Sequence, residues 1–193
     1  MLDRTTFLVK ERVAFLKLSD TYDILDPASG SPIGIAQEQV SAPMKLLRLL
    51  VKKQLLPTTV VVSERENGPP VLSIRRSFTF LRSKVTVHAA SGESIGHFRS
   101  KLFSLGGAFR VHNADGAEVA LVKGDWKGWN FQFLDQNGAR IGTVTKKWAG
   151  IGKELFTSAD NYVIALERAG LPAAVSALLL AAGLAIDIVY KER

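Results

Sequence analysis

The segment that most restricts the fold is LPAAVSALLLAAGLAIDIVY, residues 171–190, near the end of the sequence. Its first 16 residues, up to Ile186, carry no charged side chain. Pro172 suits the first turn of a helix, where the amide proton that proline lacks would have no partner. A helix that is apolar on all sides either spans a membrane or is enclosed by other parts of the protein. The sequence therefore predicts a hydrophobic helix at 171–189 in one of these two environments.

The length and width of this helix favour the enclosed position. A membrane span needs about 20 apolar residues, and Asp187 interrupts the apolar segment after 16. Seven of those 16 residues are alanine or glycine, so the helix is slim and fits inside a β-barrel. A membrane anchor is the alternative that the sequence leaves open.

The rest of the chain repeats one hairpin pattern four times. In each copy a strand leads to a polar turn with a glycine, and a second strand follows; the glycines are Gly30, Gly92, Gly116 and Gly138. Asp115-Gly116 and Asn137-Gly138 favour the primed two-residue turns of hairpins. Alternation of apolar and polar residues predicts strands near 6–10, 14–18, 21–25, 33–39, 58–64, 70–76, 84–88, 94–100, 107–112, 118–123, 129–134, 140–146 and 161–166.

So many antiparallel strands must close on themselves or leave exposed edges. We therefore expect one mainly β domain, residues 1–193, in which a closed antiparallel barrel surrounds the hydrophobic C-terminal helix.

A second segment that interrupts the β pattern is PMKLLRLLVKKQLLP, residues 43–57. On a helical projection Lys45, Arg48 and Lys52 share one face, with Lys53 at the margin of the other. The broad opposite face is apolar and contains Met44, Leu46, Leu47, Leu50, Val51 and Leu55. Such a basic amphipathic helix either binds an anionic membrane surface or covers a barrel mouth, with its leucines packed and its cations solvated.

The composition restricts the partners and the chemistry. Lysine and arginine number 25 against 18 acidic residues, a formal net charge of +7, which suits a polyanionic partner. There is no cysteine, which excludes disulfides, zinc–thiolate sites and thiol catalysis. Charged residues within the first 12 positions interrupt any signal peptide, so we expect a cytoplasmic protein. We find no catalytic motif and expect no enzyme.

Several cations recur in the predicted strands. Arg75, Arg76, Lys146 and Lys147 are candidates for an outer phosphate-binding patch, together with Arg82, Lys84, Arg99, Lys101 and Arg110; the alternative is an ordinary solvated surface. A hairpin would place His97 opposite His112, which is a weak metal or phosphate site without a third ligand. Nucleic acid is not expected, because the aromatic residues at 126–133 have the spacing of a packed strand rather than of a base-stacking surface.

The stretches GDWKGWNFQF and IGTVTKKWAGIGKELFTSADNY, within residues 73–164 and followed by the apolar helix, carry a resemblance. The chain resembles a bacterial member of the phospholipid scramblase and LURP-one-related family, in the Tubby C-terminal-like superfamily. The resemblance implies a barrel of about twelve strands around the C-terminal helix. It also implies phospholipid binding and membrane association.

The family's calcium-binding segment corresponds to SADNYVIALERA, residues 158–169. Asp160 and Asn161 match the family there, whereas Ser158 and Ala169 stand where family members carry acidic residues. Calcium prefers six to eight oxygen ligands, and this set is too small. We therefore expect no cofactor, with calcium at Asp160 and Asn161 as the alternative.

These observations lead to a functional expectation with one alternative. We expect a non-catalytic phospholipid-interacting module that docks on anionic membrane surfaces. It would lie peripherally on the inner face of the membrane. An extension of this hypothesis is that it takes part in lipid translocation. The alternative is a cytosolic scaffold, or a barrel for a small apolar ligand, with no membrane role. The sequence specifies no protein partner.

Overall fold

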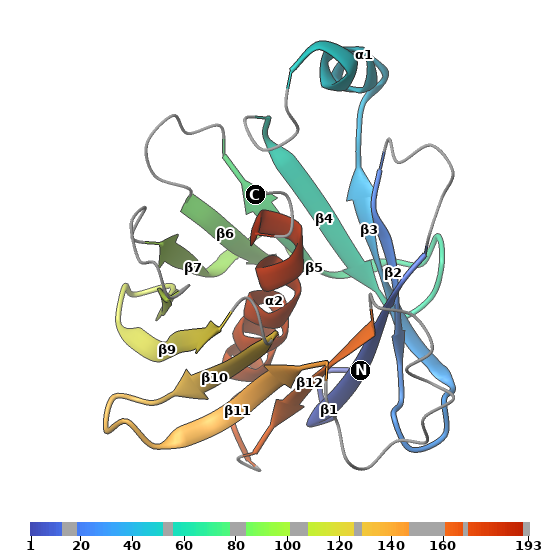
Figure 1. The fold of residues 1–193 in the computed structure, drawn as a ribbon. Coiled ribbons are helices and arrows are strands. Elements are labelled where there is room, and N and C mark those ends of the chain that lie inside the picture. The colour runs from blue at the N-terminus through green and yellow to red at the C-terminus, as the bar shows by residue number, and fades with distance from the viewer. Residues whose placement is uncertain are drawn as a thin grey trace.

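The computed structural model describes residues 1–12, 19–51, 56–77, 84–100, 108–125, 129–146, 161–167 and 170–190. These residues form twelve strands and two helices (Figure 1). The strands are β1 (Thr6–Glu11), β2 (Thr21–Leu25), β3 (Pro32–Gln39), β4 (Thr58–Ser63), β5 (Pro70–Arg76), β6 (Lys84–Ala89), β7 (Ser94–Ser100), β8 (Phe109–Asn113), β9 (Glu118–Asp125), β10 (Asn130–Leu134), β11 (Arg140–Thr145) and β12 (Asn161–Leu166). The helices are α1 (Ala42–Leu50) and α2 (Ala173–Tyr190).

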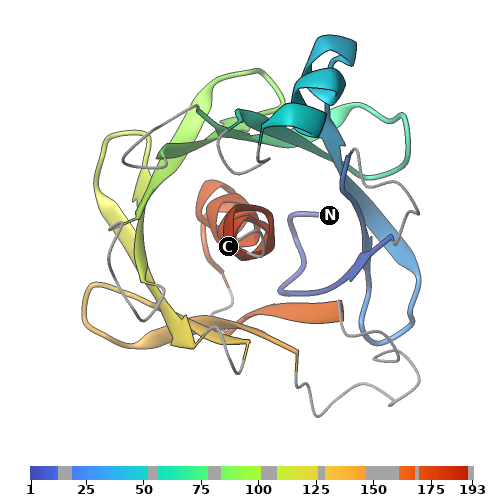
Figure 2. The ribbon, with the colours of Figure 1, turned by 45° about the horizontal axis from the view of Figure 1, so that its top comes forward.

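The strands form one closed barrel, as the sequence predicts. Each strand pairs antiparallel with the next along the chain, and β1 closes the ring by pairing with β12 from Thr6 opposite Ala165 to Lys10 opposite Asn161. Seen along the barrel, the ring surrounds α2 (Figure 2). Closure leaves none of the described strands with an unpaired edge, which is the usual reason for a β-sheet of this size to close.

The hairpin turns differ in detail from the prediction. Gly116 and Gly138 have φ of +82° and +77°, but Asp115 and Asn137 have no positive φ, and a primed type I turn needs a positive φ at both central residues. In the second turn the Asp135 carboxylate accepts hydrogen bonds from the amides of Asn137 and Ala139, both at 2.9 Å. This side-chain acceptor stabilises a longer turn in which glycine alone takes the left-handed conformation.

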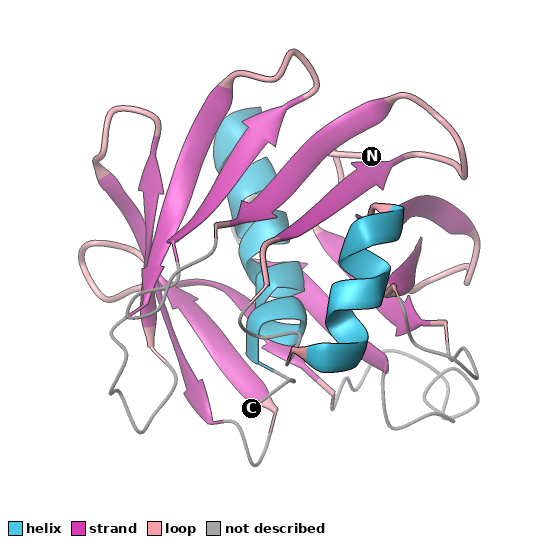
Figure 3. Ribbon diagram, turned by 90° about the horizontal axis from the view of Figure 1, so that it is seen from above, coloured by secondary structure: helices cyan, strands magenta, loops and turns pink. Residues whose placement is uncertain are grey.

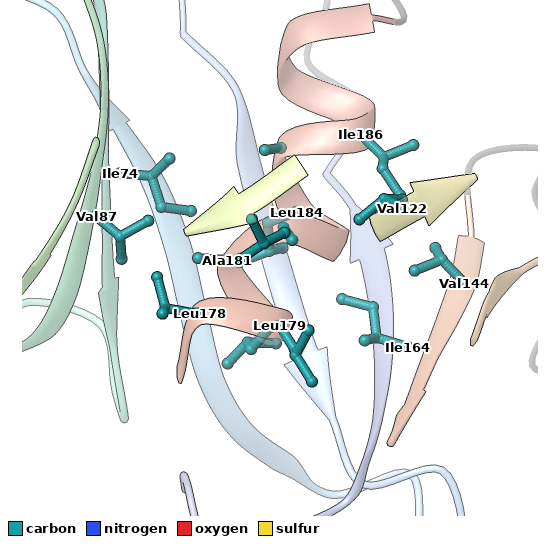
Figure 4. Packing of buried hydrophobic residues seen from close by; sticks show 14 of the residues in the cluster. Ile74, Val87, Val122, Val144, Ile164, Leu178, Leu179, Ala181, Leu184 and Ile186 are labelled. Atoms are coloured by element: carbon teal, nitrogen blue, oxygen red, sulfur yellow. The ribbon is translucent and has the colours of Figure 1, made fainter. Parts of the chain in front are cut away.

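Helix α2 fills the barrel. Leu178, Leu179, Leu180, Leu184 and Ile186 are fully buried, and they pack against inward-facing residues of the strands, among them Ile74, Val87, Val122, Val144 and Ile164 (Figure 4). Burying one such side chain contributes about 1.5–3 kcal/mol, so the helix and the ring stabilise each other. The enclosed environment predicted for this segment is confirmed.

Close contact between α2 and the wall depends on small residues. Gly96 in β7 faces α2, and a Cβ atom placed there would lie 2.2 Å from the His112 carbonyl oxygen and 2.8 Å from Leu178 Cδ2. A side chain at this position would have to displace backbone on one side and the helix on the other.

We therefore expect Gly96→Val to lower the free energy of unfolding by about 1–3 kcal/mol or more, the usual cost of overpacking a core. Urea unfolding followed by circular dichroism measures it. Ser94→Val, at an exposed position of the same strand, is the matched control and should stay within about 0.5 kcal/mol of wild type. Equal stability of both variants would contradict the contact.

Helix α1 is shorter than predicted. It ends at Leu50, because Val51 is already extended, with φ −123° and ψ 137°. The chain must return to the barrel here, since Leu56 is buried and β4 begins at Thr58. Residues 52–55, like the strand expected at 14–18, lie outside the described residues.

Candidate functional site

Helix α1 exposes an apolar face. It stands at one end of the barrel, beyond β3 and β4 (Figure 1), outside the ring of strands in the view along the barrel (Figure 2), and is separate from α2 (Figure 3). Its leucines are exposed, and Leu46, Leu49 and Leu50 are 68%, 71% and 87% exposed. At 100° per residue these leucines share one side, and Lys45 is exposed beside them. A contiguous exposed apolar patch of this kind commonly marks an interaction surface.

The opposite side of α1 holds the helix to the barrel. Met44 and Arg48, four residues apart, lie on this inward side. Arg48 makes a two-pronged ion pair with Glu38 of β3, with Nη2 2.5 Å from Oε1 and Nη1 3.0 Å from Oε2. The two side chains are 4% and 1% exposed. Glu38 also accepts a hydrogen bond from the Asp20 amide at 3.1 Å.

This orientation corrects both expectations for the helix. Arg48 does not share an exposed cationic face with Lys45, because it pairs with a carboxylate that faces into the barrel. The leucines are not packed against the barrel mouth. Lys52 and Lys53 lie outside the described residues. Sequence reasoning also missed Leu49 and Glu38, although alternation along β3, with Gly34 and Ala36 inward, placed Glu38 on the inner face.

The other predicted cations fall into three environments. Arg75 is exposed on the outer wall of β5. Arg76, the next residue, faces inward and is 6% exposed; it donates hydrogen bonds to the Leu56 carbonyl at 3.2 Å and to Thr58 Oγ1 at 2.9 Å. Its role is therefore structural, and it does not belong to a surface patch. Lys146 lies 4.5 Å over the Trp129 ring in a cation–π contact, and Lys147 lies outside the described residues.

The expected histidine pair is present. His97 and His112 are register partners on β7 and β8, and their rings stack with centroids 5.0 Å apart. Burial, and secondly the neighbouring cations and His112, lower the pKa of His97. Among the described residues no group of three or more histidine, aspartate or glutamate side chains is placed to hold a metal ion.

The residues of the expected calcium segment do not converge. Asn161 begins β12 and is 2% exposed, whereas Glu167 follows the other end of that strand and pairs with Arg140 at 2.7 Å. Six strand residues separate the two ends by roughly 20 Å. Asp160 lies outside the described residues.

Asp187, in the last turns of α2, and the phenols of Tyr22 and Tyr162 form a polar cluster inside the barrel. Asp187 is 3% exposed. Burial first, and the nearby Asp187 carboxylate second, raise the pKa of the Tyr22 and Tyr162 phenols. Both phenols therefore stay neutral at any physiological pH.

The two ends of the barrel carry different sets of charged side chains. The α1 end includes the C-terminal ends of β3 and β7, and the five hairpin tips lie at the other end. Those tips, within residues 26–31, 64–69, 90–93, 114–117 and 135–139, contain one cation, Arg65, and six carboxylates, namely Asp26, Glu64, Glu66, Glu93, Asp115 and Asp135. The exposed cations Lys45, Lys84 and Arg99 lie toward the α1 end. Three of these carboxylates are paired with cations, namely Asp26 with Arg4, Glu64 with the Met1 amino group and Glu66 with Arg12.

Two comparisons with known proteins and one property of the helices complete the description. The model of the family described as Scramblase matches residues 18–193 of the chain. No solved structure matches it. Neither described helix has the length and hydropathy needed to cross a membrane.

Proposed function

The chain belongs to the scramblase family, and from this premise we propose that it is a non-catalytic module that binds anionic phospholipid membranes through the α1 end of its barrel. The observation that carries the proposal is the outward apolar face of α1 at Leu46, Leu49 and Leu50, flanked by Lys45. An amphipathic helix of this kind lies in the membrane interface with its apolar side among the acyl chains and its cations at the headgroups.

The relative magnitudes assign most of the binding to the leucines. Complete burial of a leucine contributes about 1.5–3 kcal/mol, whereas a lysine near an anionic surface contributes about 1 kcal/mol. Three leucines therefore outweigh Lys45. The charge supplies the preference for anionic lipid and much of the orientation.

The exposed cations at the α1 end support the same orientation. Lys45, Lys84 and Arg99 would be attracted to an anionic surface, whereas Glu93, Asp115 and Asp135 at the hairpin tips would be repelled by it. The protein would then lie peripherally on the inner face of the membrane, with the barrel axis directed toward the bilayer.

Binding at the surface agrees better with this barrel than passage of lipid through it. The lumen is occupied by α2, whose residues Ala177–Ile186 are buried, so in the part of the chain that the structure describes the space around this helix leaves no polar path for a headgroup. For the same reason a small apolar ligand inside the barrel has little support. A scaffold role, in which the leucines of α1 contact another protein, is the competing function.

A flotation assay with phosphatidylglycerol vesicles tests the proposal. Leu49→Ser/Leu50→Ser should weaken vesicle binding by about tenfold or more, because each tenfold step corresponds to about 1.4 kcal/mol and the apolar contact supplies most of the energy. Both positions are exposed, so the fold should be preserved.

Charge reversal gives a matched pair of controls. Lys45→Glu at the α1 end should reduce binding at low salt, whereas Arg65→Glu, the same change at a hairpin tip, should not. If wild-type protein stays in solution with anionic vesicles at low salt, the membrane function is excluded, and the scaffold alternative takes its place.

A further inference from the structure

Three cations lie side by side on the outer wall of the barrel. Lys84 of β6 is the register partner of Arg99 of β7, which is the register partner of Arg110 of β8. All three alternate with buried residues and point outward. We call these three residues the cation row.

Such a row is unfavourable without an anion. Side chains directly opposite on neighbouring strands are about 5 Å apart at Cβ, and like charges in these positions destabilise a sheet. Arg110 is compensated, because its Nη1 lies 2.5 Å from Glu118 Oε2. In the part of the chain that the structure describes, Lys84 and Arg99 have no carboxylate within ion-pair distance. An anion between them would remove the repulsion.

The stacked histidines form the adjoining row. Thr86, His97 and His112 are register partners across the same three strands. Each lies two residues along its strand from the member of the cation row on that strand. His112 Nδ1 lies 3.2 Å from the Gly116 carbonyl oxygen, so this nitrogen carries the proton and Nε2 is left for another partner. His97 Nε2 is buried without a hydrogen-bond partner in the described structure.

The groups that face His97 are donors or cations. They come from every neighbouring strand: Lys84 and Thr86 from β6, Arg99 from β7 itself, and Arg110 and His112 from β8. Glu118 is the one carboxylate beside this set among the described residues, and Arg110 already uses it. Arg75, the register partner of Thr86, and His88, two residues after Thr86, add a further cation and a further histidine to this part of the wall.

We propose that the cation row and the His97–His112 pair form a binding site for a phosphomonoester dianion, such as the terminal phosphate of a lipid headgroup. Two cations on adjacent strands, with imidazole N–H donors in the neighbouring row, suit a compact, doubly charged anion with several acceptor oxygens. The site lies on the outer wall, apart from the leucines of α1, and the inference does not depend on the proposed membrane binding.

The site should bind an anion of constant charge, such as sulfate, more tightly as the pH falls. The pKa of His97 is lowered by burial and by the surrounding cations, so its ring is mainly neutral at pH 7 when the site is empty. Protonation turns the remaining lone pair of the His97 imidazole into a donor, and a bound anion favours that form.

Calorimetry with the full chain tests the site. Inorganic phosphate and sulfate should both bind, and sulfate binding should strengthen as the pH falls from 7.5 to 5.5, a range over which sulfate keeps both charges. Arg99→Gln and Lys84→Gln should each weaken binding by about tenfold or more, the loss of one charge-assisted hydrogen bond. They should leave the empty protein at least as stable as wild type, because repulsion is removed. Lys10→Gln, at an exposed position on β1, is the matched control.

Vesicles then identify the source of the phosphate. Binding to phosphatidic acid vesicles that exceeds binding to phosphatidylglycerol vesicles, and depends on Arg99, indicates a lipid headgroup. Equal binding to both vesicles, with Arg99-dependent binding of inorganic phosphate, indicates a free phosphate compound.

Two results would overturn the site. One is that neither phosphate nor sulfate binds the wild-type protein, or that both bind Arg99→Gln as tightly as wild type. The other is Arg99-dependent binding of a single-stranded RNA oligonucleotide without binding of either ion. Leu49→Ser/Leu50→Ser should leave phosphate binding unchanged, so failure of the α1 surface and failure of this site are distinguishable.

Discussion

Leu179→Asp should prevent stable folding. Leu179 is fully buried where α2 passes through the barrel, and loss of such a leucine alone costs about 2–5 kcal/mol. An unpaired carboxylate in the lumen adds several kcal/mol, even after it takes up a proton. Because a domain of this kind is stable by about 5–15 kcal/mol, the combined cost consumes most of its stability. Soluble yield and urea unfolding followed by circular dichroism measure the effect.

The same helix provides the control for this variant. Ala174 is exposed in the first turn of α2, where an acidic side chain interacts favourably with the helix dipole by about 0.3–1 kcal/mol. Ala174→Asp should therefore fold with unchanged or slightly raised stability. A Leu179→Asp protein with a wild-type unfolding midpoint would show that the helix does not occupy the lumen.

Arg48→Ala should lower the free energy of unfolding by about 3–5 kcal/mol, the usual cost of removing one partner from a buried ion pair. The cost arises because the Glu38 carboxylate, 1% exposed, would stay buried without its main countercharge. Lys45→Ala, three residues away on the exposed side of α1, should change stability by less than about 0.5 kcal/mol. Chemical denaturation of both variants provides the comparison.

A double variant separates the ion pair from general damage to the helix. Replacing both partners with apolar residues, in Glu38→Leu/Arg48→Leu, should recover most of the loss, because such replacements are often neutral. If the double variant is as unstable as Arg48→Ala, the loss comes from packing and not from the unpaired carboxylate.

The sequence was informative where one physical rule decided the outcome. Alternation placed most of the strands, because each of these faces a packed interior on one side and water on the other; β12, all six residues of which are buried, is an exception. The apolar segment at 171–189 had only two possible environments, and its alanines and glycines favoured the correct one. At Arg76 the same rule was available, since Leu72 and Ile74 face inward and the next position of that set is 76.

The orientation of α1 was less accessible to sequence reasoning. A helical projection assumes that the apolar face is turned to the protein. Here Arg48 is turned inward instead, because it forms an ion pair with Glu38 of β3. That partner is ten residues away in the sequence, and its inward position becomes meaningful only when the barrel is closed. The cation row likewise depends on the register of three strands, which the sequence pattern does not fix.

The pairing of β1 with β12 has a consequence for biosynthesis. On the ribosome the first strand emerges long before its partner, and the helix that fills the lumen follows the last strand. Until then the nascent chain can form at most an open, curved sheet whose apolar concave side is exposed to water. Contacts between distant parts of a chain form slowly, and transiently exposed strands are prone to aggregate. We therefore expect a chaperone that shields apolar surfaces to raise the yield of this protein during translation.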